Sequence, residues 1–170
     1  MAGEAAYIAG DWGTTNARFW LCDGEGRVLA ESHGKGVAQL RADRKFAEAF
    51  AAATCDWPEK IPAVLCGTIG ANIGWHEVGY RAMPAGLANL EEGAFRFRGG
   101  LRNLVILAGV SGLNSFGAMD LMRGEECQLA GLSLAGARNG LFVLPGTHNK
   151  WVVLKDGQIV LERYGLDRKP

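Results

Sequence analysis

The chain has 170 residues, enough for one domain with its own core and too few for two full lobes. Lys and Arg number 18 and Asp and Glu number 18, with no long run of either sign, so we expect no nucleic-acid partner and no membrane surface. No apolar run approaches the roughly 18 residues of a membrane span, so we expect a soluble, cytoplasmic protein. The four cysteines lack metal-ligand spacing, and we expect them to be reduced thiols in the core.

The first 35 residues have the pattern of three short strands, at 7–10, 18–23 and 27–32. Residues 11–15 form the first connection, and residues 23–26, with Asp-Gly and a second glycine, suit a hairpin loop. The pattern predicts an antiparallel meander that opens an α/β domain.

Helical spacing follows from Asp43, which can cap a helix that Pro58 ends. Short apolar strands are expected at 63–66 and 104–107, and the Gly-rich segment 67–100 between them is typical of a pocket-forming insertion. We expect the meander, the helix and these strands to share one mixed sheet, with Asp11, Gly67 and Gly109 at one edge, because ligand sites of open α/β sheets gather at strand ends.

A second helix is expected over 121–134, followed by a second meander with strands at 141–144, 151–154 and 158–161. Its first connection, residues 145–150, contains Gly146-Thr147 as the first meander contains Gly13-Thr14. The chain therefore repeats an arrangement of strand, Gly-Thr turn and strand.

The turn at Asp11, Gly13, Thr14 and Thr15 follows a buried strand, so its hydroxyls and backbone N–H groups can meet phosphate oxygens. The Asp11 carboxylate beside them can hold Mg²⁺, usually through water. Taken alone, these residues fit a plain hairpin turn equally well.

A second Gly-Thr turn favours the phosphate-binding interpretation over a plain hairpin turn. Gly146, Thr147 and His148 can close on the same triphosphate from the other side, with a Gly-Glu-Glu helix start between the two turns. This layout resembles the actin, hexokinase and Hsp70 type of ATPase, an α/β mixed-sheet fold that is ribonuclease H-like, and it implies ATP and Mg²⁺ as cofactors.

A more specific resemblance runs along nearly the whole chain. Five blocks carry it, in order: Asp11-Trp12-Gly13-Thr14-Thr15-Asn16 with Arg18; Gly36-Val37; Gly74-Trp75 with Tyr80 and Pro84-Ala85; Met122-Arg123-Gly124-Glu125-Glu126 with Gln128-Leu129; and Leu144-Pro145-Gly146-Thr147-His148 with Lys150-Trp151. In these blocks the chain resembles the 2-dehydro-3-deoxygalactonokinases. The resemblance implies ATP-dependent phosphorylation of 2-dehydro-3-deoxy-D-galactonate at its 6-hydroxyl, a step of galactonate breakdown.

The segment from Gly124 also looks like the Gly-Asp-Gln segment of glycerol and xylulose kinases, in which the acidic residue is the general base. That matching makes Glu125 the base, with Glu126 as the other catalytic candidate; adjacent helical residues diverge by about 100°, so only one should reach the hydroxyl. The alternative is a pair of acidic residues favoured by the helix dipole. Arg123 can hold the substrate carboxylate or neutralise a glutamate.

For the sugar pocket, Asn72, Trp75 and Tyr80 supply an amide and two amphipathic rings, although aromatic residues in such segments often anchor a loop to the core instead. Asn16 and Arg18 join the substrate-binding candidates through the resemblance. His33 and His76 have no metal-ligand spacing and are expected to be ordinary surface or turn residues.

The C-terminal end departs from the family, because residues 164–170 match none of the segment expected there. We therefore expect a first lobe at 1–138, the opening hairpins of a truncated second lobe at 139–163, and a tail at 164–170, with possible self-association through the exposed second-lobe edge. Three hypotheses stand: a 2-dehydro-3-deoxygalactonokinase whose chain alone is incomplete, a kinase of another sugar or sugar acid, and a non-catalytic remnant that at most binds a sugar acid.

Overall fold

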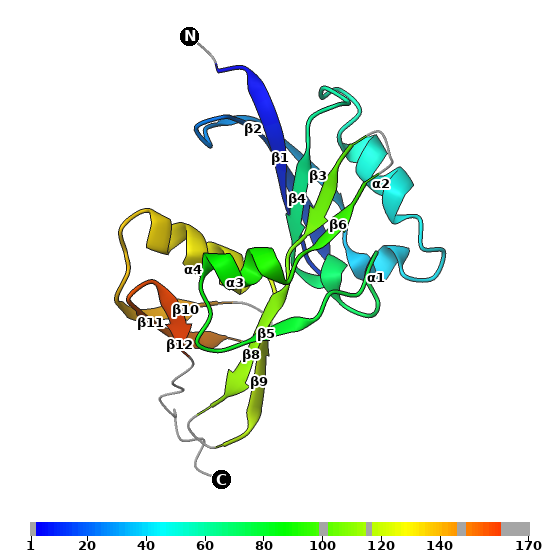
Figure 1. Cartoon of the computed structure of the whole chain (residues 1–170). Coiled ribbons are helices and arrows are strands. Elements are labelled where there is room, and N and C mark those ends of the chain that lie inside the picture. Colours follow the sequence, from blue (N-terminus) through cyan, green and yellow to red (C-terminus); the bar gives the residue numbers. More distant parts are fainter. Residues whose placement is uncertain (1–2, 99–101, 115–116, 146–148, 161–170) are drawn as a thin grey trace. The chain divides into compact units, whose positions relative to one another are not determined.

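The computed structural model describes residues 3–98, 102–114, 117–145 and 149–160 (Figure 1). The chain forms two compact units, the first made of Met1–Gly79 and Gly93–Ala108, the second of Tyr80–Glu92 and Gly109–Pro170. Each unit has its own apolar core. These compact units were defined by contacts within the chain and do not test the lobe boundary expected after residue 138, which stays a prediction.

A six-stranded mixed sheet builds the first unit, in the order β3-β2-β1-β4-β7-β6. The predicted meander is confirmed as an antiparallel set, and β4 and β7 lie parallel to β1 beyond it. The strands are β1 (Ala5–Trp12), β2 (Asn16–Asp23), β3 (Val28–Lys35), β4 (Ala63–Cys66), β6 (Phe95–Phe97) and β7 (Leu104–Ile106). The meander and both central strands therefore share one mixed sheet, as expected.

Two helices, α1 (Val37–Leu40) and α2 (Phe46–Ala53), contribute their apolar residues to the core of this sheet. Trp12 lies at the centre of the core: its ring meets Phe19 edge-on at 5.2 Å between centroids and Trp75 at 6.3 Å. Its indole N–H donates to the carbonyl of Lys35 at 2.9 Å. The last residue of β1 therefore fixes the strand end to β3 and to the core.

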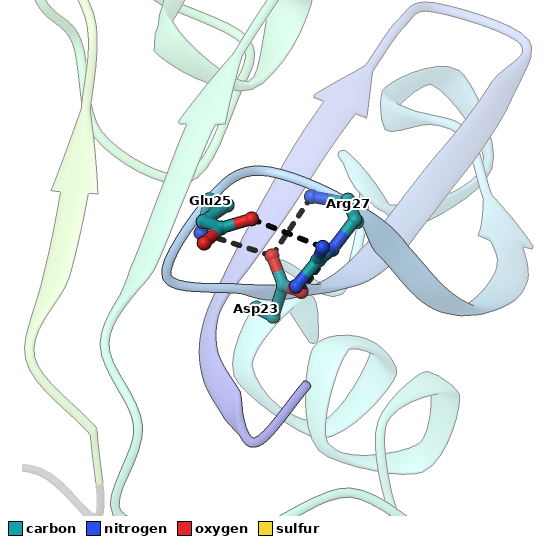
Figure 2. Close-up of polar contacts among 3 residues, drawn as sticks. All are labelled: Asp23, Glu25 and Arg27. Carbon is teal, nitrogen blue, oxygen red and sulfur yellow. Dashed lines mark hydrogen bonds and ion pairs between the residues drawn. The ribbon is translucent and has the colours of Figure 1, made fainter. Parts of the chain in front are cut away.

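The β2–β3 loop is built around the carboxylate of Asp23, which is buried at 2% exposure (Figure 2). This carboxylate accepts the backbone N–H groups of Glu25 and Arg27 at 2.9 and 3.0 Å, and the Arg27 Nε at 2.7 Å. The hydrogen bond from the Arg27 side chain is the main reason that the pKa of Asp23 is lowered. The Asp-Gly sequence predicted the hairpin, and the structure shows how the aspartate closes it.

In its described residues the second unit contains two three-stranded sheets and two helices (Figure 1). One sheet has the order β5-β8-β9 and the other β10-β11-β12. The elements are β5 (Tyr80–Ala82), α3 (Leu87–Glu92), β8 (Gly109–Leu113), β9 (Met119–Met122), α4 (Glu125–Leu134), β10 (Gly140–Leu144), β11 (Lys150–Lys155) and β12 (Gln158–Val160). Met122, Leu129 and Val152 are among the residues that form the core of this unit. The predicted second meander is confirmed.

Several expected boundaries were wrong. The helix expected over 121–134 begins only at Glu125, because 119–122 pairs with β8 and Gly124 has a φ of 106°, which ends the strand. The helix expected from Asp43 begins at Phe46; the Asp43 carboxylate accepts the N–H of Lys45 at 3.3 Å and caps no helix.

The segment 67–100 is also more ordered than its composition predicted. Its described part contains the 3₁₀ turn η1 (Thr68–Gly70), β5, α3 and β6, and it contributes to both units.

The expectation of buried thiols was wrong for Cys55, which is exposed, whereas Cys22 is buried; all four cysteines are free. None of the helices in the described part of the chain has the length and apolar character needed to cross a membrane.

Candidate functional site

The first predicted phosphate turn lies where β1 ends. The N–H of Gly13 donates to the carbonyl of Asn16 at 2.9 Å, which closes the turn, and the side chains of Thr14 and Thr15 are exposed. Asp11, one residue before the end of β1, is half-buried. The turn therefore presents two hydroxyls to solvent beside a partly desolvated carboxylate.

A neighbouring segment holds this turn from behind. The N–H groups of Gly36, Val37 and Ala38 donate to the carbonyls of Thr15, Gly13 and Thr14, at 3.2, 3.0 and 2.9 Å. A Cβ on Gly36 would lie 2.2 Å from the carbonyl carbon of Thr15, so only glycine fits there. Gly36 is a site residue that our sequence reasoning did not assign, although Gly36-Val37 was one of the blocks of the resemblance.

The end of β4 meets the same turn. Gly67 has a φ of 91°, and a Cβ there would lie 2.8 Å from the carbonyl oxygen of Trp12 and 3.1 Å from Asp11 Oδ1. The hydroxyls of Thr14 and Thr68 lie 3.1 Å apart. The predicted meeting of Asp11 and Gly67 at one sheet edge is therefore confirmed, and Thr68 is a further hydroxyl of this cluster. Gly109 begins β8 and belongs to the second unit.

The environment of Asp11 has two opposing effects on its pKa. Burial raises the pKa of Asp11, and the guanidinium of Arg18, its cross-strand partner in the register, lowers it. A partly desolvated carboxylate at a strand end fits the role of one Mg²⁺ ligand that acts with water. Among the residues that the structure describes, no three His, Cys, Asp or Glu side chains gather into a metal cluster.

The remaining sugar-pocket candidates of the first unit are exposed side chains or anchor a loop to the core. Asn16 and Arg18 are exposed on β2, and Asn72 is exposed after η1. The Trp75 ring packs against Trp12 and Phe50 at 6.3 and 6.4 Å between centroids, which is the geometry of a loop anchor. Their contact with a sugar stays a prediction.

The two glutamates lie at the start of α4 in the second unit, and each bonds back to the preceding turn. The carboxylate of Glu125 accepts the N–H of Arg123 at 3.1 Å. The carboxylate of Glu126 is fully buried and accepts the N–H of Gly124 with both oxygens, at 2.8 and 2.6 Å. The backbone before α4 is therefore fixed by the side chains of its own first two residues.

Burial separates the two glutamates chemically. Desolvation raises the pKa of Glu126 from 4.5 to about 7, although the N–H of Gly124 opposes the shift. Glu125 is half-buried, whereas Glu126 has no exposed surface. In this arrangement Glu125 is the glutamate that a ligand can touch.

Arg123 and Tyr80 form a stack near this helix start. The Arg123 guanidinium lies 4.3 Å from the centre of the Tyr80 ring, and its Nε is 3.4 Å from the Tyr80 hydroxyl. A Cβ on Gly109 would lie 2.7 Å from the Tyr80 ring, so the glycine makes room for the ring. The structure thus brings together three sequence-predicted residues, Tyr80, Arg123 and Glu125.

Gly146, Thr147 and His148 lie outside the described residues. The strands around them are described: β10 and β11 pair antiparallel, with Leu144 opposite Lys150. Asp11 and its turn belong to the first unit and Glu125 to the second, so a single site that combines them also stays a prediction.

Comparisons with known proteins show what this chain is similar to. A profile of the family described as 2-keto-3-deoxy-galactonokinase matches residues 11–163. The 2-dehydro-3-deoxygalactonokinase of Escherichia coli (strain K12) is 37% identical over 156 residues, which cover 91% of this chain and 51% of that protein. The "Probable 2-dehydro-3-deoxygalactonokinase DgoK1" of Rhizobium meliloti (strain 1021) is 37% identical over 163 residues, covering 94% and 53%.

The "Crystal structure of a putative 2-dehydro-3-deoxygalactonokinase protein from Sinorhizobium meliloti" superposes with a TM-score of 0.78 at 35% identity. The superposition covers 90% of this chain and 51% of the chain in that crystal structure. The fold is therefore the mixed α/β fold of this kinase, as the sequence predicted. The chain spans about half the length of the curated relatives that it matches.

Proposed function

The chain belongs to the 2-keto-3-deoxy-galactonokinase family, and from this premise we propose that it supplies the first half of a kinase that transfers phosphate from ATP to the 6-hydroxyl of 2-dehydro-3-deoxy-D-galactonate. The observation that carries the proposal is the family match over residues 11–163, which includes both clusters described above. Because ATP is the phosphoryl donor, we place the reaction in the cytoplasm, as a step of galactonate breakdown.

In this proposal Glu125 is the general base. As the bond between the 6-oxygen and the γ-phosphorus forms and the bond to ADP breaks, the hydroxyl proton passes to the Glu125 carboxylate. The transfer is loose and the proton leaves late, so a well-placed carboxylate suffices without a high pKa. The hydrogen bond from the N–H of Arg123 holds that carboxylate in place before substrate arrives.

Arg123 and Tyr80 are proposed to contact the sugar acid next to Glu125. Stacking on the Tyr80 ring fixes the plane of the guanidinium, and a fixed guanidinium binds a carboxylate with little loss of side-chain freedom. Asn16, Arg18, Asn72 and Trp75 are weaker proposals, since the first three are exposed and the Trp75 ring packs on the core.

The phosphate chain of ATP is assigned to the turn at Gly13, Thr14 and Thr15 and to the turn at Gly146, Thr147 and His148. Asp11 would hold Mg²⁺, which supplies positive charge to the phosphates when it is bound. The Thr14–Thr68 hydroxyl contact and the three hydrogen bonds from residues 36–38 keep the first turn rigid. Rigid donors stabilise developing charge without reorganisation during the transfer.

A chimera tests the proposal. In it, this chain replaces the matching part of the E. coli relative, and ADP release is followed with 2-dehydro-3-deoxy-D-galactonate, its C4 epimer, D-galactonate and glycerol. Activity that is greatest with the first compound supports the proposal. A preference for another sugar or acid favours the alternative of a different substrate, and a folded chimera that binds the acid without turnover favours the alternative of a non-catalytic, sugar-acid-binding fragment.

A further inference from the structure

The outer edge of the first sheet is β3, and among the described residues no other strand pairs with its outer side. Hydrogen bonds between two antiparallel strands involve every second residue of each strand. The N–H of Gly36 bonds to the carbonyl of Thr15, which continues the β2–β3 register by one pair, so the even-numbered residues before Gly36 bond to β2. Glu31, His33 and Lys35 therefore point their backbone N–H and carbonyl groups out of the sheet.

This edge is open to solvent. Glu31 Oε1 lies 3.4 Å from His33 Nε2, and the two side chains remain 46% and 69% exposed. A hollow of about 560 Å³ lies beside the strand, lined by residues 33–35 and by residues of α1, α2 and the turn between them. Three of the lining residues from α2 are alanines. A further strand would lie about 4.8 Å from β3, and the hollow leaves room for it.

The charges along β3 indicate which strand fits there. Ser32 Oγ donates to the carbonyl of Ala53 in α2, so the side chains of Glu31, His33 and Lys35 lie on the opposite face of the sheet. In a two-fold antiparallel pair centred on His33, Glu31 of each copy lies opposite Lys35 of the partner subunit. An edge that carries both signs at symmetric positions complements itself, as an isologous contact requires. A strand of one sign would be repelled by one of these two residues.

We propose that two copies of this chain associate through β3, as antiparallel strands that join their sheets across a two-fold axis at His33. The two His33 residues then exchange both backbone hydrogen bonds, and Glu31 exchanges bonds with Lys35 of the partner subunit on each side. The Lys35 carbonyl already accepts the Trp12 indole, and its second lone pair can take this further donor. The association goes beyond the proposed kinase function and is independent of the sugar acid.

The competing explanation is that charged side chains keep this edge from pairing, as they do on many edge strands. Charge reversal separates the two explanations. Glu31→Lys puts a lysine opposite Lys35 of the partner subunit, and Lys35→Glu puts a glutamate opposite Glu31 of the partner subunit, so each variant should dimerise at least 10-fold more weakly than the parent. Mixed in equal amounts, the two variants meet with opposite charges at both positions and should form a heterodimer as tight as the parent dimer.

Sedimentation equilibrium of the full chain measures these associations, with Val143→Lys in every chain to block the exposed β10 edge of the second unit. Glu77→Lys is the matched control, because it makes the same charge change at an exposed position of the same unit; it should alter the dimerisation constant less than 2-fold. A parent that stays monomeric, single variants that associate as the parent does, or a mixture that stays monomeric would each overturn the proposal.

A cross-link decides the matter where a charge variant fails to fold. Opposed residues of a hydrogen-bonded pair lie about 5.5 Å apart between Cα atoms, which a disulfide spans. In the background Cys55→Ser, which removes the exposed thiol, His33→Cys should therefore link two copies under mild oxidation. Val28→Cys is the control, since Val28 is 57% exposed and lies five residues from the axis, too far from its own copy to link. Equal linking by the two variants, or none at position 33, would also overturn the pairing.

Discussion

Replacing Glu126 by glutamine removes a titrating group from the interior of the second unit with little change in shape. The carboxylate is fully buried, and its oxygens lie 2.8 and 2.6 Å from the N–H of Gly124. Its titratable neighbours are Glu125 and Cys127, and the charge of Glu125 raises the pKa of Glu126 further. Glutamine keeps one acceptor for Gly124 and cannot ionise, so the variant isolates the effect of the charge.

The magnitude follows from the change in pKa on folding. In the unfolded chain Glu126 ionises at about 4.5, and in the folded chain burial keeps the proton on until about pH 7. Between these values the folded state binds more protons than the unfolded state, so its stability falls as the pH rises. Raising the pKa from 4.5 to about 7 corresponds to about 3 kcal/mol of unfolding free energy, lost across this window.

Urea unfolding of the parent and of Glu126→Gln at pH 4.5 and pH 8 measures this loss. The difference in unfolding free energy between the two chains cancels every other titrating group, and it should change by about 3 kcal/mol in favour of the variant as the pH rises. Leu129→Ala is the control: it opens the same core at a cost of about 2–5 kcal/mol, at both pH values alike. A parent-to-glutamine difference that is the same at both pH values would refute the reasoning.

Three other predictions concern stability and assembly. Gly36→Ala should lower the midpoint of thermal unfolding by several degrees, since its Cβ would meet the Thr15 backbone at 2.2 Å, whereas Gly24→Ala, with open space around it, should change it little; equal effects would contradict the geometry. The lowered pKa of Asp23 stabilises the parent above the ordinary pKa of aspartate, and this stability is lost as the pH falls through the lowered pKa. Asp23→Asn should therefore be less stable than the parent at neutral pH, and the unfolding free energies of the two chains, measured by circular dichroism, should converge in acid. Val143→Lys, on edge strand β10 where Leu141 and Val143 are each 47% exposed, should shift a self-associating chain toward monomer in light scattering, and an unchanged mass would count against association through this edge.

The first sheet could be predicted because local signals agree with tertiary structure there. Alternating apolar residues and the Asp-Gly loop at Asp23 predict the meander, and the short apolar runs at 63–66 and 104–107 predict the central strands found at 63–66 and 104–106. The same signals failed at β9, where the apolar residues of 119–122 continue the spacing of the helix after them. Only the positive φ of Gly124 separates the two elements.

The candidate site was predictable in its residue types and not in their environments. The motif indicated two glutamates, but the full burial of Glu126 arises only in the folded second unit, whose core contains Met122 and Leu129. The ion pair of Asp120 with Lys150 joins residues 30 positions apart, and no spacing rule reaches that far. For Trp75 the sequence allowed a sugar contact or a loop anchor, and the structure shows the ring packed against the core.

The central claim is that Glu125 of this chain takes the proton of the sugar acid. Single-turnover phosphorylation of 2-dehydro-3-deoxy-D-galactonate by the chimera, compared for Glu125→Gln and Glu126→Gln, tests it most directly. We expect Glu125→Gln to slow the transfer about 100-fold or more with little change in substrate affinity, because a general base is lost, and Glu126→Gln to slow it less. A reversed order, with the larger loss in Glu126→Gln, would show that Glu126 and not Glu125 is the base.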